Sequence, residues 1–365
     1  DKYFSIYSLY LHNKIRKEKE NMGNSKKKRD SANSKFALLI IAAIVLFGGY
    51  IAFFSSMSKD GKAHYVMVDE DDTPDSILHK LKPEAKGYGF LVYKQLASVI
   101  GYGDHIRVGR YKIGNSGALM TFRHIRNGMQ APISLTIRSV RTLGDLADDV
   151  CKQMMFTRAE FMNKITDPET CKKYGYTPMT IIAMFVPNTY DFYWDTSLDK
   201  FLDKINAGSK KFWNFERTQK AKQMGFTPVE VITMASIVDE ETDNVEEMPM
   251  VAGMYMNRYK KGMRLQADPT VKYATRNFTA HRIYEKWTRE DSPYNTYMYK
   301  GLPIGPIRIP SVDAIDAVLN YVHHDYMYMC AKEDFSGTHN FAKTYEEHQV
   351  NADNYAKALD EKGIK

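Results

Sequence analysis

A single carboxylate, that of Glu241, stands at the end of an apolar segment and in front of a dense polar run. At about 100° per residue of an α-helix, Met234, Ile237 and Val238 lie on the same side as Glu241. A carboxyl group against such side chains loses hydration, so its charged form is disfavoured and its pKa rises. A group of this kind suits a general acid that works near neutral pH.

Two further acids precede Glu241 in the same segment. Asp239 falls nearly opposite on the predicted helix and Glu240 falls on one flank, so we expect both to stay solvated. The alternative for Glu241 is that it, too, is only the solvated end of an amphipathic helix, because such ends are common. Periodicity alone leaves both interpretations open.

The helix that carries Glu241 has a well-specified start. Thr227 is a good N-cap, Pro228 suits the first helical position, and Glu230 completes a capping box three residues after the cap. The sequence therefore predicts a helix that begins at Pro228 and reaches Glu241.

Several blocks of residues match, in order, the signature of a known family. They are Phe185–Tyr190 (FVPNTY), Ala235–Thr242 (ASIVDEET), Val251-Ala252, Met256–Arg258 (MNR), Gly262–Gln266 (GMRLQ), Asp268–Val271 (DPTV), Ser292–Tyr297 (SPYNTY), Gly301–Pro303 (GLP), Gly305–Ile307 (GPI), His339–Phe341 (HNF) and His348. Over residues 130–355 the chain thus resembles the endolytic murein transglycosylases, the MltG/YceG-like family. The resemblance implies an enzyme that cleaves the MurNAc–GlcNAc bond of nascent peptidoglycan strands without water and leaves 1,6-anhydroMurNAc ends.

The resemblance also implies which residues do the work. The family's catalytic residue is the second acid of a block that usually reads S-I-[IV]-E-K-E, and Glu241 occupies that position here. The chain departs from the pattern at Asp239, which replaces the usual Glu, at Glu240, which replaces the usual Lys, and at Ile304, where a second Pro is common. Loss of the Lys charge beside the catalytic position would change how the acid is tuned.

Further positions that match the family's polar blocks are expected to bind the glycan: Asn257, Arg258, Gln266, Asp268, Thr270, Tyr294, Asn295, Thr296, Tyr190 and His339. Asp268 has a second interpretation as an Asx-type turn residue. A carboxylate near Glu241 would instead raise the pKa of Glu241 or act as a second catalytic group. The aromatic cluster Tyr190, Phe192, Tyr193 and Trp194 has two interpretations as well, a platform for sugar rings or ordinary core.

Other functions stay open at this stage. A lysozyme-type muramidase acts on the same substrate with two carboxylates, which would require Asp268 or Asp239 to lie across the cleft from Glu241. A non-catalytic protein that binds the cell wall is the third hypothesis, and the intact Glu241 block argues against it.

Residues 36–54 carry no charge and, at about 1.5 Å per residue, roughly span a hydrocarbon core of about 30 Å. Lys26, Lys27, Lys28, Arg29 and Lys35 precede this segment, so the positive-inside rule places the tail in the cytoplasm and the chain after Ser55 outside the inner membrane. A cleaved signal peptide is the competing interpretation, but the run is long for one and lacks a small-x-small site. The anchor keeps the active site near lipid-linked synthesis, which suggests peptidoglycan synthases as partners.

The predicted fold class is α+β, and we expect four parts. These are a basic cytoplasmic tail without fixed structure at residues 1–35 (1–21 being a candidate non-native extension), the transmembrane helix at 36–54, a small α+β module at 62–136, and a helix-rich catalytic domain at 137–365. The small module resembles the family's LysM-like module. In the module we expect a strand at His64–Val68, a helix at Ser76–Leu81, a glycine-rich link at Gly87–Gly89, a helix at Val92–Ile100 and the segment Arg107–Ile113. In the catalytic domain we expect helices at Leu143–Met154, Arg158–Lys164, Asp199–Asn206 and Val312–Asn320.

Composition limits the partners and cofactors. Residues 1–35 contribute a net charge of +6 to the chain's +7, so the other 330 residues are nearly neutral and offer no footprint for nucleic acid. No CxxC or HExxH motif is present, and His323, His324, His339 and His348 lack a recognisable ligand spacing, so we expect neither a metal nor a cofactor. Of the three cysteines, Cys151 and Cys171 are either bridged or buried as free thiols.

Overall fold

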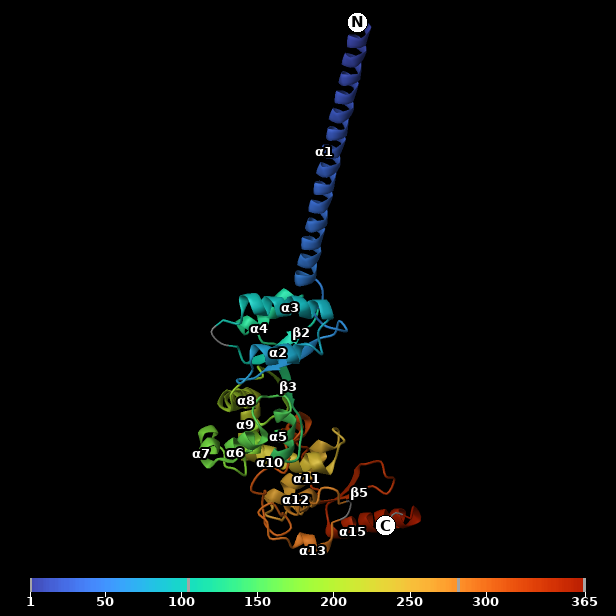
Figure 1. The fold of residues 1–365 in the computed structure, drawn as a ribbon. Coiled ribbons are helices and arrows are strands. Elements are labelled where there is room, and N and C mark those ends of the chain that lie inside the picture. Colours follow the sequence, from blue (N-terminus) through green and yellow to red (C-terminus); the bar gives the residue numbers. More distant parts are fainter. Residues whose placement is uncertain (1, 104–105, 281–282, 364–365) are drawn as a thin grey trace. The chain divides into compact units, whose positions relative to one another are not determined.

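The computed structural model describes residues 2–103, 106–280 and 283–363, although the side chains of 2–7, 24–27 and 30–32 lie outside the description. The chain forms two compact units, Asp1–Ala131 and Pro132–Lys365, and each is described here by itself (Figure 1). The fold is mixed and rich in helices, with three two-stranded antiparallel sheets among the described residues. This confirms the predicted α+β class.

The first unit begins with one long helix, α1 (Lys2–Phe53). Its segment Asn33–Phe53 is long and apolar enough to cross a membrane, and none of it is buried. The expectation of an unstructured tail before this segment is wrong, because the same helix continues back to Lys2. The tail is rich in Lys and Arg, which are good helix formers, and Arg16 pairs with Glu20 one turn later at 3.4 Å.

The rest of the first unit is a small α+β module. Strand β1 (His64–Val68) pairs with β2 (Gly109–Ile113), and the helices are α2 (Pro74–Leu81), α3 (Gly87–Ile100) and α4 (Ala118–Asn127). Tyr93, Tyr111 and Phe122 are fully buried in its core. The predicted glycine link at Gly87–Gly89 is instead the first turn of α3. Gly89 is buried and faces Met57.

In the second unit, strand β3 (Ile133–Ile137) pairs with β4 (Asn188–Phe192). Around this sheet lie α5 (Leu143–Cys151), α6 (Arg158–Thr166), α7 (Pro168–Tyr174), the 3-10 helix η1 (Ile181–Met184) and α8 (Leu198–Phe212), which share a core with large aromatic side chains. The helices predicted from Leu143 and Arg158 are confirmed within three residues, and the helix predicted at Asp199–Asn206 is confirmed but continues to Phe212. Cys151 and Cys171 are free, so the bridge between them does not form.

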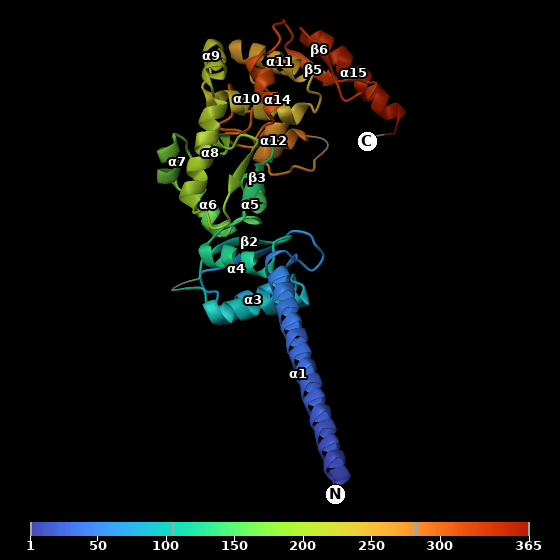
Figure 2. The ribbon, with the colours of Figure 1, turned by 90° about the horizontal axis from the view of Figure 1, so that it is seen from above.

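A second core of the same unit is built from helices around α10 (Pro228–Glu241). These are α9 (Phe215–Met224), α11 (Met248–Lys260), α12 (Asp268–Ala274) and α14 (Val312–Leu319). The short helix α13 (Glu285–Thr288), which has no buried residue, lies between α12 and α14 in the sequence, and β5 (Tyr328–Ala331), β6 (His339–Ala342) and α15 (Tyr345–Glu361) follow α14. Helices α10 and α14 lie side by side (Figure 2). A Cβ at Gly253 would lie 2.3 Å from the carbonyl oxygen of Val322, so only glycine lets α11 pack this closely.

Candidate active site

The predicted start of α10 is confirmed, because Thr227 and Glu230 form the capping box and Pro228 stands in the first turn. The helix differs from the prediction in its surroundings. It is not amphipathic: every residue from Val231 to Asp239 is buried, since neighbouring helices surround it. The two ends of α10 come nearer the surface, the first turn with Pro228, Val229 and Glu230 and the last with Glu240 and Glu241.

The expectation that Asp239 and Glu240 stay solvated is wrong. Arg308 forms ion pairs with both, at 3.0 Å from its Nε to Asp239 Oδ2 and at 2.9 Å from its Nη1 to Glu240 Oε1. Ser311 donates a hydrogen bond of 2.5 Å to Asp239, and Arg141 pairs with Glu240 at 2.8 Å. Helical phase places these acids away from Glu241, but tertiary packing surrounds them with cations and hydroxyls rather than water.

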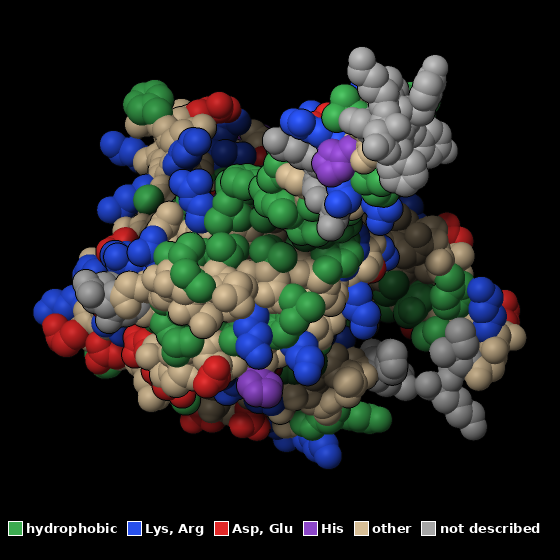
Figure 3. Space-filling view, turned by 45° about the horizontal axis from the view of Figure 1, so that its top comes forward, with side chains coloured by type: hydrophobic (Ala, Val, Ile, Leu, Met, Phe, Trp, Pro, Cys, Tyr) green, Lys and Arg blue, Asp and Glu red, His purple; other side chains and the backbone are tan. Residues whose placement is uncertain are grey.

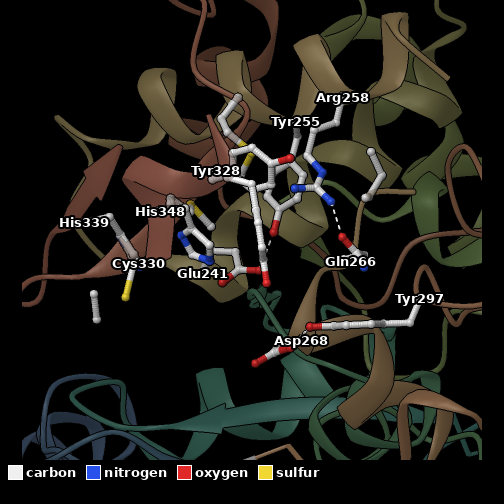
Figure 4. Close-up of a pocket in the computed structure, with 15 residues that line it drawn as sticks. Glu241, Tyr255, Arg258, Gln266, Asp268, Tyr297, Tyr328, Cys330, His339 and His348 are labelled. Carbon is white, nitrogen blue, oxygen red and sulfur yellow. Dashed lines mark hydrogen bonds between the residues drawn. The ribbon is translucent and has the colours of Figure 1, made fainter. Parts of the chain in front are cut away.

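Glu241 faces a cavity of about 380 Å³ in the second unit (Figure 4). The cavity wall comes from five parts of the chain. The end of α10, helix α11 and the segment 265–268 follow one another in the sequence, and the loop at Tyr297 and the C-terminal part from β5 to α15 complete the wall. The Glu241 carboxylate, at the end of its helix, therefore faces a polar, partly enclosed space rather than open solvent.

The hydroxyl of Tyr255, on α11, donates a hydrogen bond of 2.5 Å to Glu241 Oε1. Burial, more than any other influence, raises the pKa of Glu241 from 4.5 to about 7. The negative charge of Asp268 raises this pKa further, and the hydrogen bond from Tyr255 opposes the rise. A carboxyl group in this state holds its proton in a substantial fraction of molecules near neutral pH, as a general acid must.

Asp268 is the first residue of α12 and lines the same cavity as Glu241. Its Oδ1 accepts a hydrogen bond of 2.6 Å from the Tyr297 hydroxyl, and Tyr297 lines the cavity too (Figure 4). Burial and the charge of Asp268 raise the pKa of Tyr297, so the phenol stays protonated as the donor. The Tyr297 side chain therefore holds the Asp268 carboxylate at the cavity wall.

Arg258 and Gln266 join two walls of the cavity. The Arg258 guanidinium donates to the carbonyl oxygens of Arg264, at 3.0 Å, and Met327, at 2.9 Å, and it also donates to the side-chain oxygen of Gln266. Gln266 has a φ of 50°, a left-handed conformation that is uncommon for residues other than glycine. The structure thus gives Arg258 a clear part in holding the loop that presents Gln266.

Two histidines also line the cavity. Glu247 accepts hydrogen bonds from the backbone N–H of His339, at 2.6 Å, and from its ring nitrogen Nδ1, at 2.9 Å, which fixes the orientation of the imidazole. The ring of His348 stacks on Tyr328 at a centroid distance of 5.4 Å, and burial lowers the pKa of His348.

The structure brings together Glu241, Arg258, Gln266, Asp268 and His339 of the predicted site, and places the other predicted residues elsewhere. Asn257 donates to the carbonyl oxygens of His324 and Tyr326, and Tyr190 is buried in the core beside Gly208. Thr270, Asn295 and Thr296 are buried and hold the loops next to Asp268, and Tyr294 lines a second cavity.

Several residues of the cavity were not among those predicted, above all Tyr255, Tyr297 and Tyr328. Tyr255 lies on a separate helix from Glu241, so no helical spacing relates the two. Tyr297 closes the matched block Ser292–Tyr297, and His348 belongs to the matched blocks as well. The family resemblance was therefore the sequence feature that pointed toward Tyr297 and His348. No feature of the sequence predicted that Tyr255 would be buried beside a carboxylate.

Comparisons with known proteins agree on one family. Residues 66–354 match the YceG-like family. The chain is 36% identical over 284 residues to an endolytic murein transglycosylase of Bacillus subtilis, which covers 69% of this chain and 77% of that protein. It is 31% identical over 170 residues to an endolytic murein transglycosylase of Streptococcus pneumoniae, covering 45% of this chain and 30% of the longer relative.

A solved structure is also similar. A crystal structure of a YceG-like protein from Listeria monocytogenes superposes with a TM-score of 0.53 at 25% sequence identity, covering 79% of this chain and 98% of the other.

Proposed function

This chain belongs to the YceG-like family, and on that premise we propose that it is a membrane-anchored endolytic murein transglycosylase in which Glu241 is the catalytic acid and base. The observation that carries the proposal is the state of Glu241: a carboxyl group at the end of a buried helix that faces a cavity and has its pKa raised to about 7. Family membership supplies the substrate class, and the geometry supplies the group that acts on it.

The reaction needs one group that first gives and then takes a proton. Protonated Glu241 donates its proton to the glycosidic oxygen as the bond from C1 of N-acetylmuramic acid to that oxygen breaks. The resulting carboxylate accepts the proton of the C6 hydroxyl as the C6 oxygen bonds to C1. The product end is 1,6-anhydroMurNAc, no water is consumed, and Glu241 is protonated again.

Tyr255 and Asp268 have supporting roles in this proposal. Because the Tyr255 hydroxyl is bound to Oε1, the proton of Glu241 is carried on Oε2, which leaves one oxygen to serve the substrate. The Asp268 carboxylate, held by Tyr297, stabilises positive charge that develops on the sugar ring in the transition state. Gln266, His339 and Arg258 position the sugar and the surrounding wall.

Hydrolysis of the same bond is the second candidate, and one observation favours it. Asp268 lines the same cavity as Glu241, so a second carboxylate is available to act as a base toward water or as a nucleophile. Asp239, the other acid considered for this role, is held by Arg308 and Ser311. A purely wall-binding protein remains the third candidate, in which Glu241 would be dispensable.

The remaining parts complete the proposal. The apolar segment Asn33–Phe53 anchors the chain in the inner membrane with the basic tail in the cytoplasm, and the catalytic part acts outside it. The module at residues 62–136 is LysM-like and holds the glycan, and residues 137–365 form the catalytic domain. The exposed hydrophobic side chains of α1 are the surface that a membrane covers. In Figure 3, hydrophobic side chains gather across the middle of the face, and Lys, Arg, Asp and Glu lie mostly toward its edges. Peptidoglycan synthases are the expected partners.

The test is the length of uncross-linked glycan strands after incubation with the full chain in detergent. The proposal predicts that wild type shortens the strands and that Glu241→Gln, which keeps the shape of the side chain but cannot transfer a proton, leaves them at full length. Equal shortening by both proteins would remove Glu241 from the reaction.

A further inference from the structure

A second cavity, of about 580 Å³, shares two wall segments with the candidate active site. Helix α12 contributes Asp268 at its start to the first cavity and Tyr273 near its end to the second. The loop that follows α13 contributes Tyr297 to the first cavity and Tyr294 to the second. A substrate bound at Glu241 therefore has this second cavity as its neighbour along α12.

The wall of the second cavity is largely apolar and aromatic. The rings of Tyr273 and Tyr294 meet at a centroid distance of 4.7 Å, and the Tyr294 hydroxyl lies 3.7 Å from the sulfur of Met179. Met179 is 48% exposed although it borders this cavity, and Met162 lines it as well. Methionine and tyrosine at such a surface adapt to a bound chain with small apolar groups.

One cation, Arg276, completes the wall, and no acidic residue is among the described residues that line it. The Arg276 guanidinium lies 4.4 Å above the ring of Tyr273 and is exposed. Among residues 2–103, 106–280 and 283–363, no carboxylate forms an ion pair with it. Its φ of 57° is a left-handed conformation just after α12 in which glycine is favoured, so the backbone gives no reason for an arginine here.

We propose that this cavity binds the carboxylate-bearing peptide stem of a muramoyl unit, an inference that rests on the proposed function. The apolar wall accepts the small side chains of the stem, and Arg276 binds a stem carboxylate in the two-pronged geometry that guanidinium groups favour. A neutral sugar ring would use the tyrosine faces but would give the guanidinium no carboxylate to bind. The second cavity thus makes the enzyme favour strands that still carry stems.

The experiment compares two substrates with the full chain in detergent: uncross-linked glycan strands with intact peptide stems, and the same strands after an amidase has removed the stems. The measured quantity is the ratio of kcat/KM for the two. Arg276→Gln is the test variant, and Arg289→Gln is the matched control because Arg289 is exposed, pairs with Glu285 and lines neither cavity. A melting temperature for each protein establishes that the variants are folded.

We expect wild type and Arg289→Gln to favour stem-bearing strands. Arg276→Gln should lose about tenfold in kcat/KM on those strands, because a charged hydrogen bond is lost. Its kcat/KM on stripped strands should change little. Arg276→Lys should recover part of the preference. An equal ratio in wild type and Arg276→Gln would overturn the inference and leave the proposed function intact. If wild type cleaves neither substrate, the proposed function fails and the inference fails with it.

Discussion

The hydroxyl of Tyr255 lies 2.5 Å from Glu241 Oε1 and joins the middle of α11 to the end of α10. Tyr255 is buried, and burial together with the negative charge of Glu241 raises its pKa well above the usual value, so its hydroxyl is protonated and remains a donor near neutral pH. The bond holds one oxygen of Glu241 in place and leaves the other for proton transfer. The proposed proton transfer depends on the hydrogen bond between Tyr255 and Glu241 more than on any other contact.

The pH dependence of catalysis follows from the state of Glu241. Its pKa is raised to about 7, and the first step requires the protonated form, so kcat/KM should fall as pH rises through about 7. This fall of kcat/KM on the alkaline side, the alkaline limb, should be absent near pH 7 for an ordinary glutamate, whose carboxyl is already ionised well below that pH. Initial rates at low substrate concentration over a pH series measure the limb. A rate that stays level through pH 7 and rises above it would contradict Glu241 as the acid.

Tyr255→Phe removes the donor to Glu241 and keeps the ring. Because this hydrogen bond lowers the pKa of Glu241, its loss should move the alkaline limb of kcat/KM to higher pH. The freed carboxyl should also lose its orientation, so we expect kcat to fall by roughly tenfold to a hundredfold. Pre-steady-state or initial-rate profiles of the variant measure both effects. An unshifted limb would mean that Tyr255 serves packing alone.

Asp268→Asn should shift the limb in the opposite direction. The charge of Asp268 raises the pKa of Glu241, so its removal should move the alkaline limb to lower pH. Tyr297→Phe is the matched variant, since it removes the partner of Asp268 but leaves the charge in place. We expect a shift in the first variant and a smaller one in the second. Identical profiles for wild type and Asp268→Asn would show that Asp268 does not influence Glu241.

Arg308→Gln tests the ion pairs behind the catalytic end of α10. Asp239 and Glu240 are largely buried, and removal of their shared cation leaves buried negative charge, which typically costs about 3 kcal/mol or more. The control is Arg138→Gln. Arg138 pairs with Asp149 at 2.8 Å on the surface, where an ion pair contributes less than about 1 kcal/mol to stability. Denaturant unfolding followed by near-UV circular dichroism measures both. Equal stability of the two variants would contradict the role of Arg308.

Local sequence chemistry predicted the start of α10 well, because the capping box of Thr227 and Glu230 needs only neighbouring residues. The same reasoning failed for Asp239 and Glu240. Helical phase assumes one buried face, whereas α10 is surrounded on all sides, and the cation that makes burial of these acids tolerable, Arg308, comes from a distant loop. No local sequence pattern predicts such a partner.

The candidate site was predictable in part for the same reason. Glu241 was found by helical phase and by family resemblance, while Tyr255 required knowledge of how α11 crosses α10. Asn257 and Tyr190 illustrate the reverse case, since they belong to matched blocks but serve the packing of their surroundings in this structure. A block that matches a family signature thus contains residues that support a site as well as residues that face it.

The most direct test of the account is the chemistry of the new chain end. The full chain in detergent should be incubated with uncross-linked glycan strands in water enriched in heavy oxygen, with Glu241→Gln in parallel, and the products analysed by mass spectrometry. The account predicts anhydro-ended fragments that carry no heavy oxygen and that are absent with the variant. Reducing ends that carry heavy oxygen would contradict it, because water would then have attacked the sugar, and the protein would be a hydrolase.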